Sequence, residues 1–163
     1  MKKVIMIAAM AAVTSLNVFA ADKENAREQM VMRVVNALKQ SSAFSYTELI
    51  PSISELHNLM KENSELYGPY LQEAGREMSN EYAHKFLPAV EEAFESVIEE
   101  GKRKGIDWSN IRFVNFEYAA SENEIPSDLT VVFLSNGKQY KVQIAKAFFV
   151  NGQFRVNQFI RFV

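Results

Sequence analysis

Two Asn-Gly dipeptides in the second half of the chain constrain the fold more than any other feature. They are Asn136-Gly137 and Asn151-Gly152, and each separates two runs in which apolar and polar residues alternate. Asn-Gly is typical of the two-residue hairpin turn that needs positive φ at both central residues. Alternation with a period of two is typical of strands that bury one face. The pattern predicts an antiparallel sheet over residues 111–162, with strands at 111–118, 129–134, 139–149 and 153–162.

These turns also predict how the strands pair. A two-residue loop at the first turn places three pairs on one face: Phe133–Tyr140, Val131–Val142 and Leu129–Ile144. At the second turn the pairs are Phe149–Phe154 and Ala147–Val156. Continued unbroken, that second register would put Arg155, Asn157 and Arg161 on the core face. We therefore expect one β-bulge that changes the side-chain parity, near residues 145–147 or near 158–159, and this bulge would bend the sheet.

Residues 23–104 carry helical spacing instead. The first predicted helix covers residues 23–40, with an apolar face made by Met30, Val31, Val34, Val35 and Leu38. Ser45 and Ser52 each stand three residues before a glutamate, which is the capping-box pattern of a helix start. A break is expected at Gly68-Pro69. In the last helical region, residues 70–104, Pro88 predicts a kink or a restart and Gly105 the end.

The first twenty residues have the layout of a secretory signal peptide. Lys2 and Lys3 precede an apolar run of about a dozen residues, and Val18 and Ala20 form a small-x-small end. The run is shorter than the roughly 20 residues that span a bilayer. We therefore expect residues 1–20 to be a signal, cleaved between Ala20 and Ala21, and the protein to be exported, either to the periplasm or outside the cell. No cysteine follows the run, so a lipoprotein anchor is not expected, and no later segment suggests a membrane anchor.

The remaining residues 21–163 fit a single α+β domain. Loss of Lys2 and Lys3 would move the formal charge from −2 to −4. Nucleic-acid binding is not expected of such a chain, because phosphate contacts need clustered lysine and arginine. There is no cysteine, so the domain must be held together by its core.

Helices first and a four-stranded meander last resemble the cystatin-like and nuclear-transport-factor-2-like (NTF2-like) cone folds. The resemblance is carried by Asn136-Gly137, Asn151-Gly152 and the strands around them, including Tyr140-Lys141-Val142 and Gln153-Phe154-Arg155-Val156. It implies helices packed in the concavity of a bent sheet, with a pocket between the two layers. It does not imply a function, because one fold serves many.

Little in the sequence points to catalysis. Cysteine nucleophiles are absent, and there are only two histidines, His57 and His84. Glu81 and His84, three residues apart, fit either an oriented imidazole or a solvated helix pair. Without further ligands nearby, we expect no metal and no cofactor. The enzymes of the resembling folds place polar groups inside the cone, where this chain offers only Tyr118 and Tyr140; each is interpreted as a ligand contact or as a self-satisfied edge of the core.

Two further candidates concern partners. Trp108 is interpreted either as an exposed anchor or as a plug at the end of the core. Val132 and Leu134, with Phe162, would give the outer sheet face an apolar patch suited to a partner or a second copy, unless the first helix covers it. The favoured hypothesis is a non-catalytic binding or protein-interaction domain for an apolar ligand or a protein. The alternatives are a cofactor-free isomerase or lyase acting through Tyr118 or Tyr140, and an inhibitor that uses a loop at 121–127.

Overall fold

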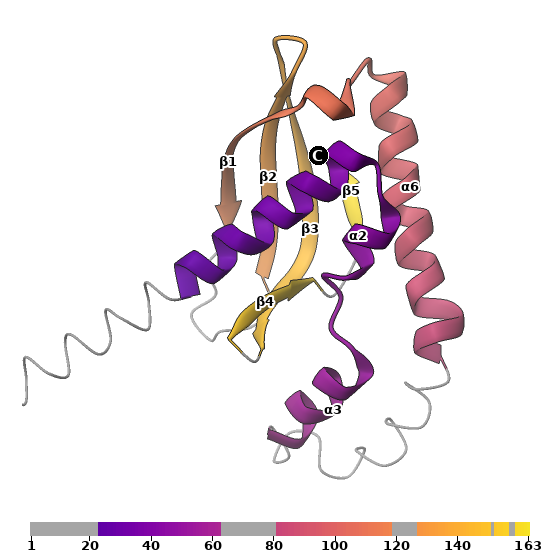
Figure 1. The fold of residues 1–163 in the computed structure, drawn as a ribbon, viewed down its shortest axis with the longest axis vertical. Coiled ribbons are helices and arrows are strands. Elements are labelled where there is room, and N and C mark those ends of the chain that lie inside the picture. Colours follow the sequence, from indigo (N-terminus) through magenta and orange to yellow (C-terminus); the bar gives the residue numbers. More distant parts are fainter. Residues whose placement is uncertain (1–22, 63–80, 119–126, 151, 157–158) are drawn as a thin grey trace, which may run out of the picture.

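The computed structural model describes residues 23–62, 81–118, 127–150, 152–156 and 159–163. The expected signal peptide, the break at Gly68-Pro69 and most of the expected loop at 121–127 lie outside these residues. A helix over residues 23–40 comes first. It is followed by α2 (Ala43–Thr47), α3 (Ile53–Glu62), the π-helical turn η2 (Tyr82–Phe86), α6 (Leu87–Arg103), the 3₁₀ turn η3 (Trp108–Asn110), β1 (Arg112–Tyr118), β2 (Ser127–Ser135), β3 (Lys138–Val150), β4 (Gln153–Val156) and β5 (Ile160–Phe162). The fold is α+β, as predicted: helices lie against an antiparallel sheet that does not close into a barrel (Figure 1).

Strand pairing follows the predicted register. The order is β1-β2-β3-β4, and β5 also pairs with β3. All three pairs predicted around the first turn are present, as are both pairs predicted around the second. Asn136 and Gly137 have φ values of 50° and 77°, which is the conformation for which Asn-Gly is suited. Gly152 also has φ 77°, while Asn151 lies outside the described residues.

Strand β3 contains the predicted irregularity at the first of its two predicted positions. Leu129 pairs with Ile144, but Ser127 pairs with Ala147, so one residue of β2 faces two residues of β3. The extra residue changes the side-chain parity, and Ala147 is fully buried like Ile144. On the opposite side of β3 the predicted single last strand is divided into β4 and β5.

Helix starts agree with one of the two predicted capping boxes. The backbone N–H of Ser52 donates to Glu55 Oε2 at 2.8 Å, and the N–H of Glu55 donates to Ser52 Oγ at 3.2 Å. The alternative start at Ser45 is not realised, because Ser45 lies inside α2 and is not its cap. Ser42 caps that helix, accepting from the N–H of Ser45 at 3.1 Å. Ser42 has the extended backbone that an N-cap needs, because Ser41, at φ 50°, ends the preceding helix.

Pro88 occupies the first turn of α6, where a missing N–H costs nothing, so it marks a restart after η2. Gly105, at φ 77°, follows the end of α6 as predicted. Among the described residues no helix is long and apolar enough to cross a membrane.

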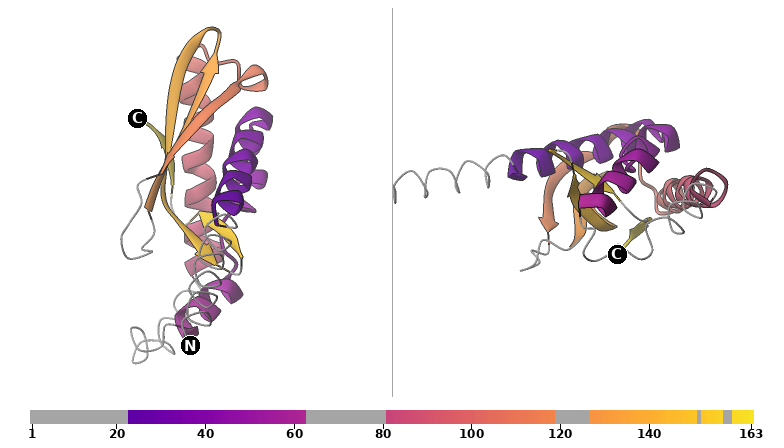
Figure 2. Two further views of the ribbon diagram at one scale, coloured as in Figure 1. Left: turned by 90° about the vertical axis from the view of Figure 1, so that its left-hand side faces the viewer. Right: turned by 90° about the horizontal axis from the view of Figure 1, so that it is seen from below.

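Both long helices pack on the same face of the sheet, and the opposite face carries no described helix (Figure 2). The first helix, α2 and α6 contribute Val31, Val34, Leu38, Tyr46 and Phe94 to one core cluster with the inward residues of β2 and β3. The predicted alternative that the first helix covers the outer face is therefore wrong.

Candidate functional site

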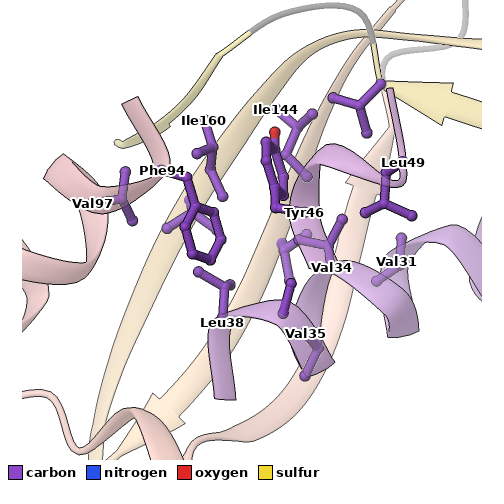
Figure 3. Close-up of a cluster of buried hydrophobic side chains, with 14 of the residues drawn as sticks. Val31, Val34, Val35, Leu38, Tyr46, Leu49, Phe94, Val97, Ile144 and Ile160 are labelled. Atoms are coloured by element: carbon purple, nitrogen blue, oxygen red, sulfur yellow. The ribbon is translucent and has the colours of Figure 1, made fainter. Parts of the chain in front are cut away.

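The space expected between sheet and helices is filled by the protein's own side chains. Five inward strand residues have no exposed area: Leu129, Val131, Phe133, Val142 and Ile144. Val34 and Leu38 of the first helix, Tyr46 of α2 and Phe94 of α6 lie against this layer (Figure 3). The Tyr46 and Phe94 rings stack with centroids 5.0 Å apart. Any binding site within the described residues must therefore be sought at the surface.

Trp108 plugs one end of the core and is not an exposed anchor. It is 4% exposed, and its indole N–H donates to the carbonyl of Ile98 at 2.9 Å. A Cβ added to Gly101 would lie 2.2 Å from the indole ring, so this glycine lets the ring lie flat against α6. The ring also lies 5.6 Å from Phe133 and 6.2 Å from Phe162.

The outer sheet face lacks the expected apolar patch. Val132 is 2% exposed, and Leu134 is half-buried. Phe162 belongs to the inner face, contrary to expectation. The parity change in β3 alters the register of the last strands, so that Phe162 pairs with the inward residue Val142. Polar side chains bridge the strands on the outer face: Lys141 pairs with Glu117 across β2 at 2.8 Å, Arg161 donates twice to Gln143, and Gln143 donates to Asp128. This face offers ion pairs and amides to a partner.

Tyr140 lies at the edge of the core near the first hairpin. Its ring stacks on Phe133 with centroids 5.9 Å apart, and its hydroxyl donates to the carbonyl of Lys104 at 3.3 Å. An open hollow of about 770 Å³ lies beside it, lined in part by Lys104 and Lys138. Because its hydroxyl already donates to the backbone carbonyl of the residue that caps the end of α6, Tyr140 serves to hold β3 against the end of that helix.

Tyr118 lies in a groove between β1 and the start of the first helix. The Arg27 guanidinium lies 3.9 Å above the Tyr118 ring and 5.0 Å from the Phe154 ring, a cation–π arrangement. The Arg27 side chain is 17% exposed and pairs with Glu24, but its Nε is buried and has no hydrogen-bond partner among the described residues. The groove has a volume of about 600 Å³, and Phe113 and Phe116 add to its wall.

Tyr118 and Tyr140 do not form one site. Tyr118 pairs with Leu129, whereas Tyr140 pairs with Phe133, four residues further along β2. At 3.3 Å per residue the two tyrosines are separated by about 13 Å along the sheet. They line separate hollows, so an acid–base pair made of both is not available.

A second polar cluster joins α3 to β4. Arg155 donates from Nε and Nη2 to Glu55 Oε1 at 3.1 and 2.8 Å, and from Nη1 to the carbonyl of Glu48 at 3.2 Å. The hydroxyl of Tyr82 donates to the carbonyl of Pro51 at 2.6 Å. These groups border an open hollow of about 770 Å³, together with Thr47 and Ser54.

The electrostatics of this cluster suit a structural tie better than acid–base chemistry. Burial alone would raise the pKa of the Glu55 carboxyl, but hydrogen bonds from Ser52 and Arg155 and the Arg155 charge outweigh it and hold the pKa below its ordinary value. A general acid near neutral pH needs the opposite shift. Burial, with the nearby Glu55 charge, raises the pKa of Tyr82, which keeps its hydroxyl protonated as a donor.

The predicted arrangement of Glu81 and His84 does not give a site. Glu81 pairs with Lys85 at 2.5 Å, and His84 is exposed one turn along the same segment. The side chain of His57 lies outside the described residues. Across the described part of the chain, no three histidine or acidic side chains are grouped so that they could hold a metal ion.

Arg27 and Arg155 are the functional candidates that sequence reasoning missed. Arg27 stands three and four residues before Met30 and Val31, so helical periodicity alone indicates that it shares their buried face. The position of Arg155 could be predicted only once the parity change in β3 was known. No local sequence pattern indicates that its partner is Glu55, 100 residues earlier in the chain.

Comparison with known proteins finds no match: no family model, no curated protein and no solved structure is significantly similar to this chain.

Proposed function

We propose that this chain is an exported, non-catalytic protein-interaction domain that binds an extended polypeptide segment along β1. The observation that supports this most is the contrast between the filled interior and the open groove beside Tyr118. The space in which a cone-fold enzyme would hold its substrate is occupied by Val34, Leu38 and Phe94. The likeness to cystatin-like and NTF2-like folds stays a prediction.

The groove has the chemistry that recognition of a polypeptide needs. β1 is the terminal strand of the sheet among the described residues, so its outer edge carries unpaired backbone donors and acceptors. An extended segment that adds to such an edge gains main-chain hydrogen bonds, and pockets for alternate side chains give specificity. Phe113, Phe116 and Tyr118 supply an aromatic wall, and Arg27 supplies a positive charge.

Selection from a displayed peptide library on residues 21–163, with affinities measured by fluorescence polarisation, tests the proposal. We expect the affinity of selected peptides for Arg27→Gln and for Tyr118→Ala to be at least about tenfold lower, because buried tyrosine and arginine side chains contribute most of the binding energy at interfaces. The matched control is Arg33→Gln, which alters an exposed arginine on the solvent face of the same helix. Peptides that bind both groove variants and the control with equal affinity would show that the groove is not the binding surface.

Export is a separate part of the proposal and rests on residues 1–20. Intact mass spectrometry of protein secreted by a bacterial host should give a chain that begins at Ala21. A mass that retains Met1 to Ala20 in the exported fraction would exclude cleavage at this position.

A further inference from the structure

Strand β1 has an open edge that can pair with another strand. It spans seven residues, Arg112 to Tyr118, and pairs only with β2 within the described part of the chain. No described strand lies beyond it, although the start of the first helix passes its lower end (Figure 1). Val114, on this strand, is 44% exposed.

An extra residue sets the pattern of side chains along this edge. Phe113 pairs with Phe133 and Asn115 with Val132, so Val114 is the bulged residue. Because of the bulge, Phe113 and Phe116 both lie toward the inner face, although they are three residues apart. Arg112 and Glu117, five residues apart, are both exposed. Without the bulge, residues at these odd spacings would lie on opposite faces.

This pattern is complementary to itself. If two copies of β1 run antiparallel about a two-fold axis between Val114 and Asn115, Arg112 of each copy faces Glu117 of the other. In the same register Phe113 faces Phe116 of the other copy. Paired residues of antiparallel strands lie on the same face, and the bulge is what allows both pairs to satisfy this condition.

We propose that the partner of β1 is a second copy of this chain, paired in this register to give a continuous sheet across the dimer. The inference rests on the proposed function, and it identifies the polypeptide that binds along β1. Each interface of this kind is isologous, so every favourable contact occurs twice. Glu117 uses Oε1 for Lys141, which leaves its Oε2 to accept from Arg112 of the second copy.

Charge reversal tests the register directly. Light scattering coupled to size exclusion, over protein concentrations up to about 1 mM, should show a dimer for residues 21–163. Arg112→Glu and Glu117→Arg should each weaken the dimer by roughly tenfold or more, because two attractions become two repulsions. The double variant, Arg112→Glu with Glu117→Arg, should restore most of the affinity, since each opposite-charge pair is re-formed with exchanged signs.

Matched controls are Arg33→Glu and Glu91→Arg, which reverse exposed charges on the first helix and on α6. They should leave the dimer unchanged. A chain that stays monomeric at every concentration overturns the inference and would leave the bulge and charges of β1 as protection against edge pairing. A dimer that is equally stable in wild type, in the two single reversals of Arg112 and Glu117 and in their double reversal overturns it as well.

A cysteine scan keeps the inference testable if a charge variant fails to fold. The chain contains no cysteine, so a single cysteine introduced at each position of β1 forms only an intermolecular disulfide under oxidation. Cross-linking should be strongest at Val114 and Asn115, next to the two-fold axis, and weakest at Tyr118, the residue of β1 farthest from it; any other maximum contradicts the register. Monomeric protein that still binds selected peptides through Arg27 and Tyr118 would refute only the dimer, whereas loss of both activities would refute the proposed function too.

Discussion

Among single residues, Tyr46 is unusual because its hydroxyl is fully buried and has no hydrogen-bond partner within the described part of the chain. Burial raises the pKa of this phenol well above its ordinary value, so it stays neutral. A buried hydroxyl without a partner costs free energy that its ring must offset through packing on Phe94. Tyr82 is the opposite case, because its hydroxyl donates to the carbonyl of Pro51 at 2.6 Å.

We expect Tyr46→Phe and Tyr82→Phe to change stability in opposite directions. Tyr46→Phe removes an unsatisfied group and should raise the free energy of unfolding by up to about 1 kcal/mol. Tyr82→Phe leaves the Pro51 carbonyl without its donor and should lower it by about 1 kcal/mol. Urea denaturation of both variants checks this, and a loss of stability in Tyr46→Phe would mean that its hydroxyl has a partner in solution, such as a bound water.

Residue roles were predictable where periodicity fixes a face and were missed where a partner lies far along the chain. The inward position of Leu129, Val131 and Phe133 follows from one turn and a period of two. Phe162 was placed on the wrong face because its orientation depends on a bulge in another strand. The contact of Arg155 with Glu55 depends on how α3 meets β4, which no local pattern encodes.

At the scale of elements, the corner between α6 and η3 depends on one close approach. Trp108 lies so near the backbone of α6 that a Cβ on Gly101 would lie 2.2 Å from Cζ2 and 2.6 Å from Cε2 of the indole. The hydrogen bond from Trp108 to Ile98 holds the ring in this position. A glycine near the end of a helix is ordinarily a weakness in helix propensity, but here it makes room for the aromatic ring.

Gly101→Ala should therefore destabilise the protein although alanine is the better helix former. Propensity alone favours alanine by about 1 kcal/mol, whereas forcing a methyl group into this contact should lower the free energy of unfolding by about 1–3 kcal/mol. The matched control is Ser96→Ala on the exposed face of the same helix, which should be neutral or slightly stabilising. Thermal and urea unfolding compare the two; equal stabilisation by both substitutions would contradict the packing at this corner.

Elements with strong local signals were predicted well. The helix at residues 23–40, both hairpin registers and the bulge in β3 follow from turn chemistry and periodicity. The cap of α2 was missed because two serines, Ser42 and Ser45, compete in one short stretch and only the positive φ of Ser41 decides between them. The division of the last strand into β4 and β5 has no local signal in the sequence.

At the scale of the whole molecule, Arg155 joins the first half of the chain to its last strands. It contacts Glu55 and the carbonyl of Glu48, and the N–H of its neighbour Val156 donates to the carbonyl of Leu49 at 3.0 Å. The Arg155 and Glu55 side chains are 17% and 18% exposed. Because the pKa of Glu55 is lower in the folded protein than its ordinary value of 4.5, its ionised form stabilises the fold.

The sign of this linkage gives a pH dependence. The contribution of Glu55 is fully present above pH 4.5 and is lost as the pH falls through the lower pKa of the folded state. We expect Glu55→Gln to lower the free energy of unfolding by about 1–2 kcal/mol at pH 7 and to approach wild type in stability in acid. Glu91→Gln, on the exposed face of α6, should change it by less than about 0.5 kcal/mol at any pH. Urea denaturation of wild type and both variants, repeated from pH 7 into acid, checks this prediction. If the difference in free energy of unfolding between Glu55→Gln and wild type stays constant with pH, the Glu55 carboxylate is not the titrating group.

The shared core also dictates when the chain can fold during its synthesis. Val31 and Val34 leave the ribosome early, but the strand residues that complete their core, from Leu129 to Ile160, are made much later. Before the strands exist, the first helix can bury its apolar face only in part, against α2 and α6. A protein destined to pass through a narrow channel must stay unfolded until it has crossed. Under the proposed export, this late completion of the core would delay folding and keep the chain fit for translocation without a separate device to hold it open.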